Sequence, residues 1–154
     1  MSVATPLQLT CSWPLIEADT HLGRCWAAGD VPSADWLPDE PLSVMPGIGL
    51  WECDLATQTL RWSDGVYDLF GLPRGAVLAR DEIVALYAEP SRAAMERLRA
   101  HAIKHRRGFT LDAEIRPVNG AARWMRLIAA PICGDRGRAV RLRGIKFDVT
   151  DLYA

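Results

Sequence analysis

The last third of the chain alternates apolar and polar side chains with the two-residue period of a β-strand. Phe109–Ile115 carries the clearest alternation, and Asn119-Gly120, the dipeptide most typical of a tight β-hairpin, follows it. The sequence then predicts a strand at 122–133, a turn at Gly134–Gly137 and another strand at 139–150. Because strands joined by short turns pair with their neighbours, this region predicts three antiparallel strands.

The last of these strands contains a change of phase. Val140 and Leu142 place apolar side chains on one face, whereas Ile145 and Phe147 place them on the other. The change falls at Gly144, and glycine inside a strand often marks a bulge. We therefore predict a bulge or a sharp local twist at Gly144.

The segment before these strands predicts a hairpin followed by helices. Two short strand-like runs, 48–54 and 59–62, are separated by a polar turn. Ser63 is then a suitable N-cap for a short helix that Gly71 ends. Further helices are predicted at 81–87 and at 91–105, the second with Ser91 as its N-cap. The order of elements predicts an α+β domain with one five-stranded antiparallel sheet and helices covering one face.

The first 47 residues differ from the rest in composition and charge. They hold six of the ten prolines, three of the six tryptophans, one basic residue and six acidic ones, a net charge of −5, while residues 48–154 carry +4. A short helix is predicted at 15–28 and an extended or irregular stretch at 30–46. Three tryptophans are too much apolar surface for a free tail, so we expect this extension to pack on its own domain or on a partner.

Several functional classes are excluded by simple counts. The longest apolar run has seven residues, far fewer than the ~20 needed to cross a bilayer. The N-terminal residues lack the features of a secretion signal, and the four cysteines form no C-x-x-C pair, so we predict a cytoplasmic protein with reduced thiols. The sequence contains no G-x-S-x-G, P-loop, H-E-x-x-H or glycine-rich dinucleotide-binding motif. We therefore predict neither a catalytic nor a metal site. The acidic extension offsets the basic core, which argues against nucleic-acid binding.

Two long runs resemble one known family. Residues 47–75 resemble the opening of a PAS domain of the PAS-3 type, and residues 109–152 are similar to its three closing strands. The residues that carry the resemblance are Trp51, Trp62-Ser63, Phe70-Gly71-Leu72-Pro73, Glu114-Ile115-Arg116, Asn119-Gly120, Arg123-Trp124 and Asp148-Val149-Thr150-Asp151. Ala88-Glu89-Pro90-Ser91 departs from the His-Pro-Asp-Asp that the family often has there. The resemblance gives a PAS-like domain at 47–153 and leaves 1–46 as an N-terminal extension.

The resemblance implies sensing or protein association rather than catalysis. PAS domains hold a small apolar pocket between sheet and helices, commonly form dimers, and often precede a kinase or a cyclase. We therefore expect a stand-alone sensory or regulatory module of two-component-type signal transduction, which forms a homodimer and acts in trans on a histidine kinase or a cyclase. The alternative is a sensor that binds haem or a small apolar metabolite in the pocket.

The candidate ligand site combines two histidines with an apolar lining. His101 and His105 are four residues apart on the long helix, and His105 is expected to point toward the sheet, where a haem-binding PAS domain would place its axial ligand. The other interpretation is a helix-terminal histidine that stabilises the negative end of the helix. We expect no bound cofactor and keep haem as the alternative. The candidate pocket-lining residues, which could equally fill the space, are Tyr67, Phe70, Leu98, Leu127 and Phe147.

Two cysteines invite a comparison with the flavin-binding LOV domains. Those domains carry a reactive cysteine in an Asn-Cys-Arg-Phe-Leu-Gln helix, and this chain has no such string. Cys53 and Cys133 lie in strand-like segments, so we interpret them as small buried apolar residues.

Overall fold

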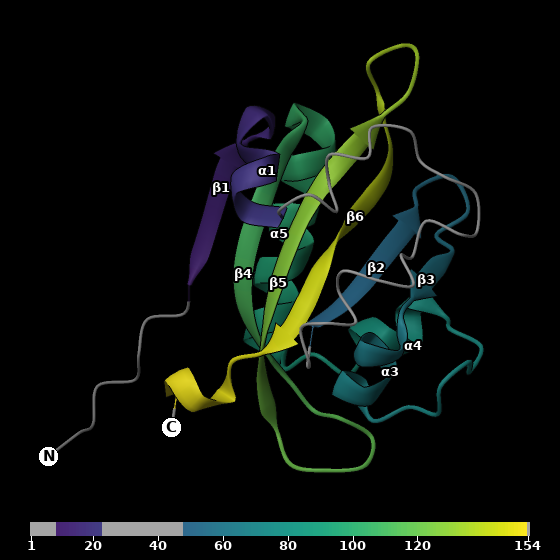
Figure 1. Ribbon diagram of the computed structural model, residues 1–154, viewed down its shortest axis with the longest axis vertical. Helices are drawn as coiled ribbons and strands as arrows, with labels where there is room; N and C mark the ends of the chain where they lie inside the picture. The colour runs from purple at the N-terminus through teal and green to yellow at the C-terminus, as the bar shows by residue number, and fades with distance from the viewer. Residues whose placement is uncertain (1–8, 23–47, 154) are drawn as a thin grey trace, which may run out of the picture.

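A six-stranded antiparallel sheet in the order β1-β4-β5-β6-β2-β3 runs through the centre of the molecule (Figure 1). The computed structural model describes residues 9–22 and 48–153. In chain order the elements are β1 (Thr10–Pro14), the 3-10 helix η1 (Leu15–Glu17), α1 (Ala18–Leu22), β2 (Ile48–Asp54), β3 (Leu60–Trp62), α3 (Asp64–Phe70), α4 (Arg80–Val84), α5 (Glu89–His105), β4 (Arg107–Ile115), β5 (Arg123–Cys133), β6 (Ala139–Asp148) and the 3-10 helix η3 (Thr150–Tyr153). The predicted α+β class is confirmed, with one strand more than the predicted five.

The three C-terminal strands form the hairpins that the alternation predicts. β4 pairs with β5 and β5 with β6, in both cases antiparallel. The connection between β5 and β6 places Gly137 in the left-handed region, with a φ of 75°, a conformation that glycine adopts without steric cost. β6 also pairs with β2, which comes much earlier in the chain. This pairing joins the two strand-forming regions into one sheet.

The sheet buries both of its faces. α3, α4 and α5 pack on one face, which we call the inner face, and α1 packs on the other, the outer face (Figure 1). The inner core includes Trp51, Trp62, Val66, Phe70, Ile83, Tyr87, Met95, Phe109, Leu111, Ile115, Met125, Leu127 and Leu142. The smaller outer core consists of Trp13, Ala18, Leu22, Leu50, Ile128, Ala130 and Ile145.

The bulge predicted at Gly144 is wrong. β6 pairs with β2 without a break through this residue, and the register shift between β5 and β6 lies between Ile132 and Cys133 instead. The change of apolar phase has another cause, because Leu142 belongs to the inner core and Ile145 to the outer one. A regular strand buried on both faces shows apolar residues in both phases.

Of the two predicted N-caps, Ser63 is confirmed in position and Ser91 is corrected. Ser63 is the N-cap of α3, which ends as predicted at Gly71 (φ 70°), but the Ser63 hydroxyl accepts a hydrogen bond from the Leu50 amide (2.8 Å) rather than from the helix. α5 begins at Glu89, two residues before the predicted start, with Ala88 as its N-cap. Ser91 lies inside the first turn. In the described ranges no helix is both long enough and apolar enough to cross a bilayer.

The described part of the N-terminal extension packs on the chain's own sheet. β1 pairs with β4 at the edge of the sheet and adds a strand that the sequence did not predict. Trp13, only 2% exposed, donates its indole N–H to the Thr110 hydroxyl (3.1 Å) and stacks on His21. A Cβ atom on Gly108, the residue opposite, would lie 2.1 Å from this indole ring, so the contact depends on glycine there.

The helix predicted at 15–28 is present over its described part. Leu15–Glu17 forms a 3-10 turn and Ala18–Leu22 continues it as α-helix. The remainder of that helix and the irregular stretch predicted at 30–46 lie outside the described residues. The boundary between an extension at 1–46 and a domain at 47–153 stays a prediction, although β1 shares the sheet of the domain.

Candidate functional site

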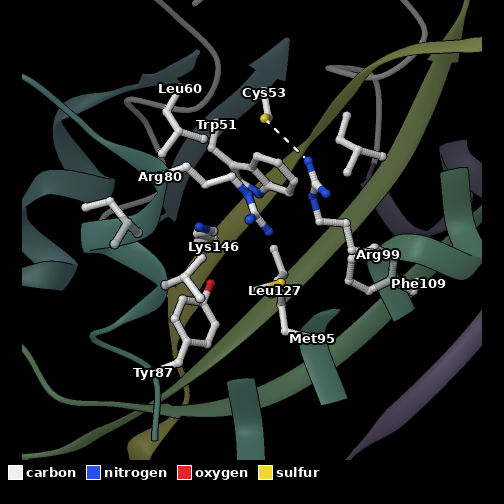
Figure 2. A pocket seen from close by; sticks show the side chains of 13 residues that line it. Trp51, Cys53, Leu60, Arg80, Tyr87, Met95, Arg99, Phe109, Leu127 and Lys146 are labelled. Carbon is white, nitrogen blue, oxygen red and sulfur yellow. Dashed lines mark hydrogen bonds between the residues drawn. The ribbon is translucent and has the colours of Figure 1, made fainter. Parts of the chain in front are cut away.

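A pocket of about 50 Å³ lies between the inner face of the sheet and the helices α4 and α5; we call it the helix–sheet pocket (Figure 2). The sheet contributes Trp51, Cys53, Leu60, Phe109, Leu127, Leu142 and Lys146 to its lining. The segment from α4 to α5 contributes Arg80, Ile83, Val84, Tyr87, Met95 and Arg99. The pocket therefore has a largely apolar wall into which three cationic side chains project.

Lys146 is the buried cation of this pocket. Its position in β6 has the same parity as that of Leu142, so its side chain points to the inner face, and it is only 6% exposed. Its ammonium nitrogen lies 5.0 Å from the ring centre of Trp51, 5.2 Å from that of Phe70 and 5.6 Å from that of Trp62. These distances are within the range of cation–π attraction.

Burial changes the acid–base behaviour of this lysine. The pKa of Lys146 is lowered to about 7, mainly by removal from water; the Cys53 sulfur opposes this change and the nearby Arg80 guanidinium adds to it. The ammonium makes no hydrogen bond and no ion pair with the described residues. Near neutral pH, therefore, the site exchanges easily between a charged and a neutral amine.

Two arginines border the same space from the helices. Arg80 forms an ion pair with Glu96, and Arg99 donates a hydrogen bond to the Gln58 side-chain oxygen (2.8 Å). Figure 2 shows the guanidinium groups of Arg80 and Arg99 reaching toward the centre of the pocket, with Arg99 toward the Cys53 sulfur. Arg80 is thus partly compensated by a carboxylate, and Arg99 is held by a neutral acceptor.

The predicted lining residues are divided between several places. Leu127 lines the pocket. Tyr67 and Phe70 lie in the inner core, with the Phe70 ring beside the Lys146 ammonium, and Leu98 packs against that core from α5. Phe147 lies on the outer face, packed against the outer core, so it does not line the pocket.

The two histidines do not reach the pocket. His101 and His105 are both exposed, and their ring centres lie 4.5 Å apart on the surface of α5. His105 is the last residue of α5 and lies beyond Ala102, the last buried position of the helix. The expectation that His105 points toward the sheet is therefore wrong. In the described part of the chain no group of three or more His, Cys, Asp or Glu side chains is placed to hold a metal ion.

Of the two cysteines interpreted as buried apolar residues, Cys53 is buried and lines the pocket, whereas Cys133 is half-buried. The sequence analysis missed Lys146, Arg80 and Arg99. A signal for Lys146 was present, because it is a lysine in the same phase of the strand as Leu142.

A second polar cluster lies on the outer face. Asp112 alternates with apolar residues along β4, a position typical of an exposed strand residue, but it is 1% exposed. Its carboxylate accepts two hydrogen bonds from Arg126 (2.8 and 2.9 Å) and one from the Tyr153 hydroxyl (2.5 Å). The Asp112 hydrogen bonds raise the pKa of Arg126. Since Tyr153 also stacks on Trp124, this cluster attaches η3 to the sheet.

A family model described as the PAS fold matches residues 59–146, which is more than half of the chain. The chain belongs to the PAS fold family. The match includes β3, the helices α3 to α5 and nearly all of β4 to β6, so every element around the helix–sheet pocket except β2 lies inside it. It is a match to a single PAS domain, and the resemblance found in the sequence is confirmed.

One curated relative is the sensor protein FixL of Bradyrhizobium diazoefficiens, which is 27% identical over 105 residues. The match covers 68% of this chain and 21% of that protein, so the chain spans about a fifth of the relative's length. The relative is thus a sensor protein that contains a region similar to this PAS domain.

Solved structures share the fold. The N-terminal domain of a diguanylate cyclase with a PAS/PAC sensor from Marinobacter aquaeolei superposes with a TM-score of 0.64 at 15% identity, over 70% of this chain and 99% of that one. A sensory box histidine kinase/response regulator from Burkholderia thailandensis gives 0.57 at 21% identity, over 68% and 79%. At these identities the likeness shows a common fold, and the chain is a PAS sensory domain of the kind found in sensor kinases and cyclases.

Proposed function

We propose that this PAS domain is a ligand-responsive sensory module, which binds a small molecule in the helix–sheet pocket and passes the signal to a signalling protein by direct contact. One observation carries the proposal: the Lys146 ammonium borders an internal pocket without a hydrogen-bonded or ionic partner among the described residues. A buried charge is normally paired, so a lysine kept beside a pocket favours a function that uses the pocket over simple filling of the core.

The proposed receiver of the signal is a histidine kinase or a cyclase. The supporting evidence is that similar PAS domains occur in proteins named as a sensor protein, a histidine kinase and a diguanylate cyclase. Homodimer formation remains part of the proposal from the sequence. It is tested by light scattering of the full-length chain, for which the expected mass is twice 17.0 kDa. A cytoplasmic location likewise stays a prediction of the sequence.

The experiment for ligand binding is native mass spectrometry of the purified full-length chain, followed by a thermal-shift screen against small metabolites. We expect a bound molecule, or a stabilising one from the screen, for the wild-type chain and for Lys104→Met. The chain has only two lysines, and Lys104 is exposed, so it is the matched control. Wild-type protein that carries no small molecule and is stabilised by none would contradict the proposal and leave protein association as the function.

A further inference from the structure

The lining of the helix–sheet pocket carries an excess of positive charge. Lys146, Arg80 and Arg99 contribute to it, and no acidic residue within 9–22 or 48–153 does. Arg80 is paired with Glu96, whose side chain is 43% exposed and lies outside the pocket lining, while Arg99 has a neutral acceptor in Gln58. Among the described residues, the charge of Lys146 is therefore not compensated by an anion.

Two hydrogen-bond donors at this pocket lack an acceptor in the described part of the chain. The indole nitrogen of Trp51 is buried without a hydrogen-bond partner, and the Lys146 ammonium offers three further N–H groups. A buried donor without an acceptor loses the hydrogen bond that it makes to water in the unfolded chain, which destabilises the fold. The three aromatic rings around Lys146 attract its charge but accept no conventional hydrogen bond. An acceptor that carries a negative charge would satisfy both donors and the charge.

The rest of the lining restricts what such an anion looks like. The remainder of the wall is mostly apolar, with Ile83, Val84, Met95, Phe109, Leu127 and Leu142. The volume of about 50 Å³ holds roughly three to five water-sized groups, whereas pockets for drug-sized ligands and cofactors measure ~300 Å³ or more. A bare inorganic ion would leave the apolar wall without a partner. A short molecule with one charged end and one hydrocarbon end can contact both the cationic and the apolar side chains.

We infer that the helix–sheet pocket binds a small monocarboxylate, with the carboxylate on the Lys146 ammonium and the Trp51 indole N–H and the short hydrocarbon part against the apolar wall. This inference rests on the proposed function and names the chemical class of its ligand. Arg80 and Arg99 add positive potential to the pocket. Binding holds Lys146 in its charged form, so above neutral pH the complex takes up a proton.

The native chain allows a direct test, because its two lysines give two separate NMR signals. Full-length protein labelled with ¹³C at lysine Cε is titrated with pH, alone and with propionate, and Lys104→Met assigns the signals. We expect the Lys146 titration midpoint to rise by more than one pH unit with propionate and to stay unchanged with propionamide, a neutral molecule of the same shape. The titration midpoint of the Lys104 signal is expected to be the same with either molecule as without it.

A second measurement uses variants. Isothermal titration with propionate is expected to give at least a tenfold weaker affinity for Lys146→Met than for Lys104→Met, and Trp51→Phe, which keeps a ring but removes the N–H, should also bind more weakly. Acetate and butyrate, in parallel, show which chain length the apolar wall accommodates.

The outcomes separate this inference from the proposed function. Equal binding of propionate and propionamide would contradict a carboxylate ligand but not the sensor function. An unchanged Lys146 signal when another molecule binds would do the same. If acetate, propionate and butyrate all fail to bind but the metabolite screen finds a neutral ligand, the same conclusion follows. If nothing binds in either experiment, both are wrong. Because the NMR titration needs only the native chain, a Lys146→Met variant that fails to fold leaves the test intact.

Discussion

Replacing Lys146 by methionine should change how the stability of this domain depends on pH. Methionine has a similar length and is apolar, so it fills the same space beside Trp51 and Phe70 without a charge. In the wild-type chain burial lowers the pKa of Lys146 from 10.5 to about 7. Between these two values the unfolded chain binds more protons than the folded one, so the free energy of unfolding rises with pH across this interval.

The size of the effect follows from the gap between the two pKa values. Each pKa unit corresponds to about 1.4 kcal/mol, so burying the protonated lysine costs on the order of 5 kcal/mol at pH values below 7. The stability that Lys146→Met gains over the wild type should be largest there and should shrink as pH rises. Between pH 6.5 and 9.5 we expect the difference between the two proteins to fall by about 3 kcal/mol.

Urea unfolding at half-unit steps of pH, followed by tryptophan fluorescence and circular dichroism, measures this difference. Other groups that titrate in the same interval, including the cysteines and tyrosines, are common to both chains and cancel when the two curves are subtracted. Lys104→Met, which removes an exposed ammonium, is the control and should stay within about 0.5 kcal/mol of the wild type throughout. The titration is performed without added carboxylate, since an anion would hold Lys146 charged.

A difference between wild type and Lys146→Met that stays constant over this pH range would refute the reasoning. It would mean that the lysine ionises as it does in water, and therefore that its side chain is not enclosed as the structure has it. A curve with the opposite slope would mean that an acidic group pairs with Lys146 and raises its pKa.

Three further substitutions test the contacts that hold the domain together. Ser91→Ala leaves the Glu114 amide without its acceptor and should cost about 1–3 kcal/mol in urea unfolding without loss of helix content by circular dichroism; a loss of helix would restore the capping role. Tyr153→Phe removes one donor from the Asp112 carboxylate and should cost about 1–2 kcal/mol and raise amide exchange at 150–153; unchanged exchange would show that the cluster does not hold η3. Trp13→Ala should cost about 3–5 kcal/mol because it empties the outer core, and a loss below 1 kcal/mol would mean that β1 is not a stable part of the sheet.

The parts of the fold that follow from local chemistry were predictable. Asn119-Gly120 and the alternation from Phe109 to Ile115 predict a hairpin because turn geometry and strand period involve neighbouring residues only. Gly71 ends α3 for the same reason, since the left-handed conformation there excludes most other residues.

The wrong predictions concern residues whose hydrogen-bond partners or burial depend on a segment that is distant in the sequence. Ser63 and Ser91 have the side chains of helix caps, yet both hydroxyls accept hydrogen bonds from strand amides, those of Leu50 and Glu114. Asp112 alternates with apolar neighbours like any exposed strand residue, but α1 and η3 cover the outer face, and Arg126 and Tyr153 complete its hydrogen bonds. Single-sequence patterns contain no information about which segment covers the second face of a sheet.

β6 contributes residues to both the helix–sheet pocket and the outer face. Its residues alternate without a break, so Lys146 lines the pocket, while Ile145 and Phe147 on either side of it belong to the outer face that α1 covers. The Phe147 ring also lies 6.0 Å from the Arg126 guanidinium, which in turn holds the Asp112 carboxylate that binds η3. The lining of the pocket and the contacts that hold α1 and η3 on the outer face therefore meet in one short stretch of β6.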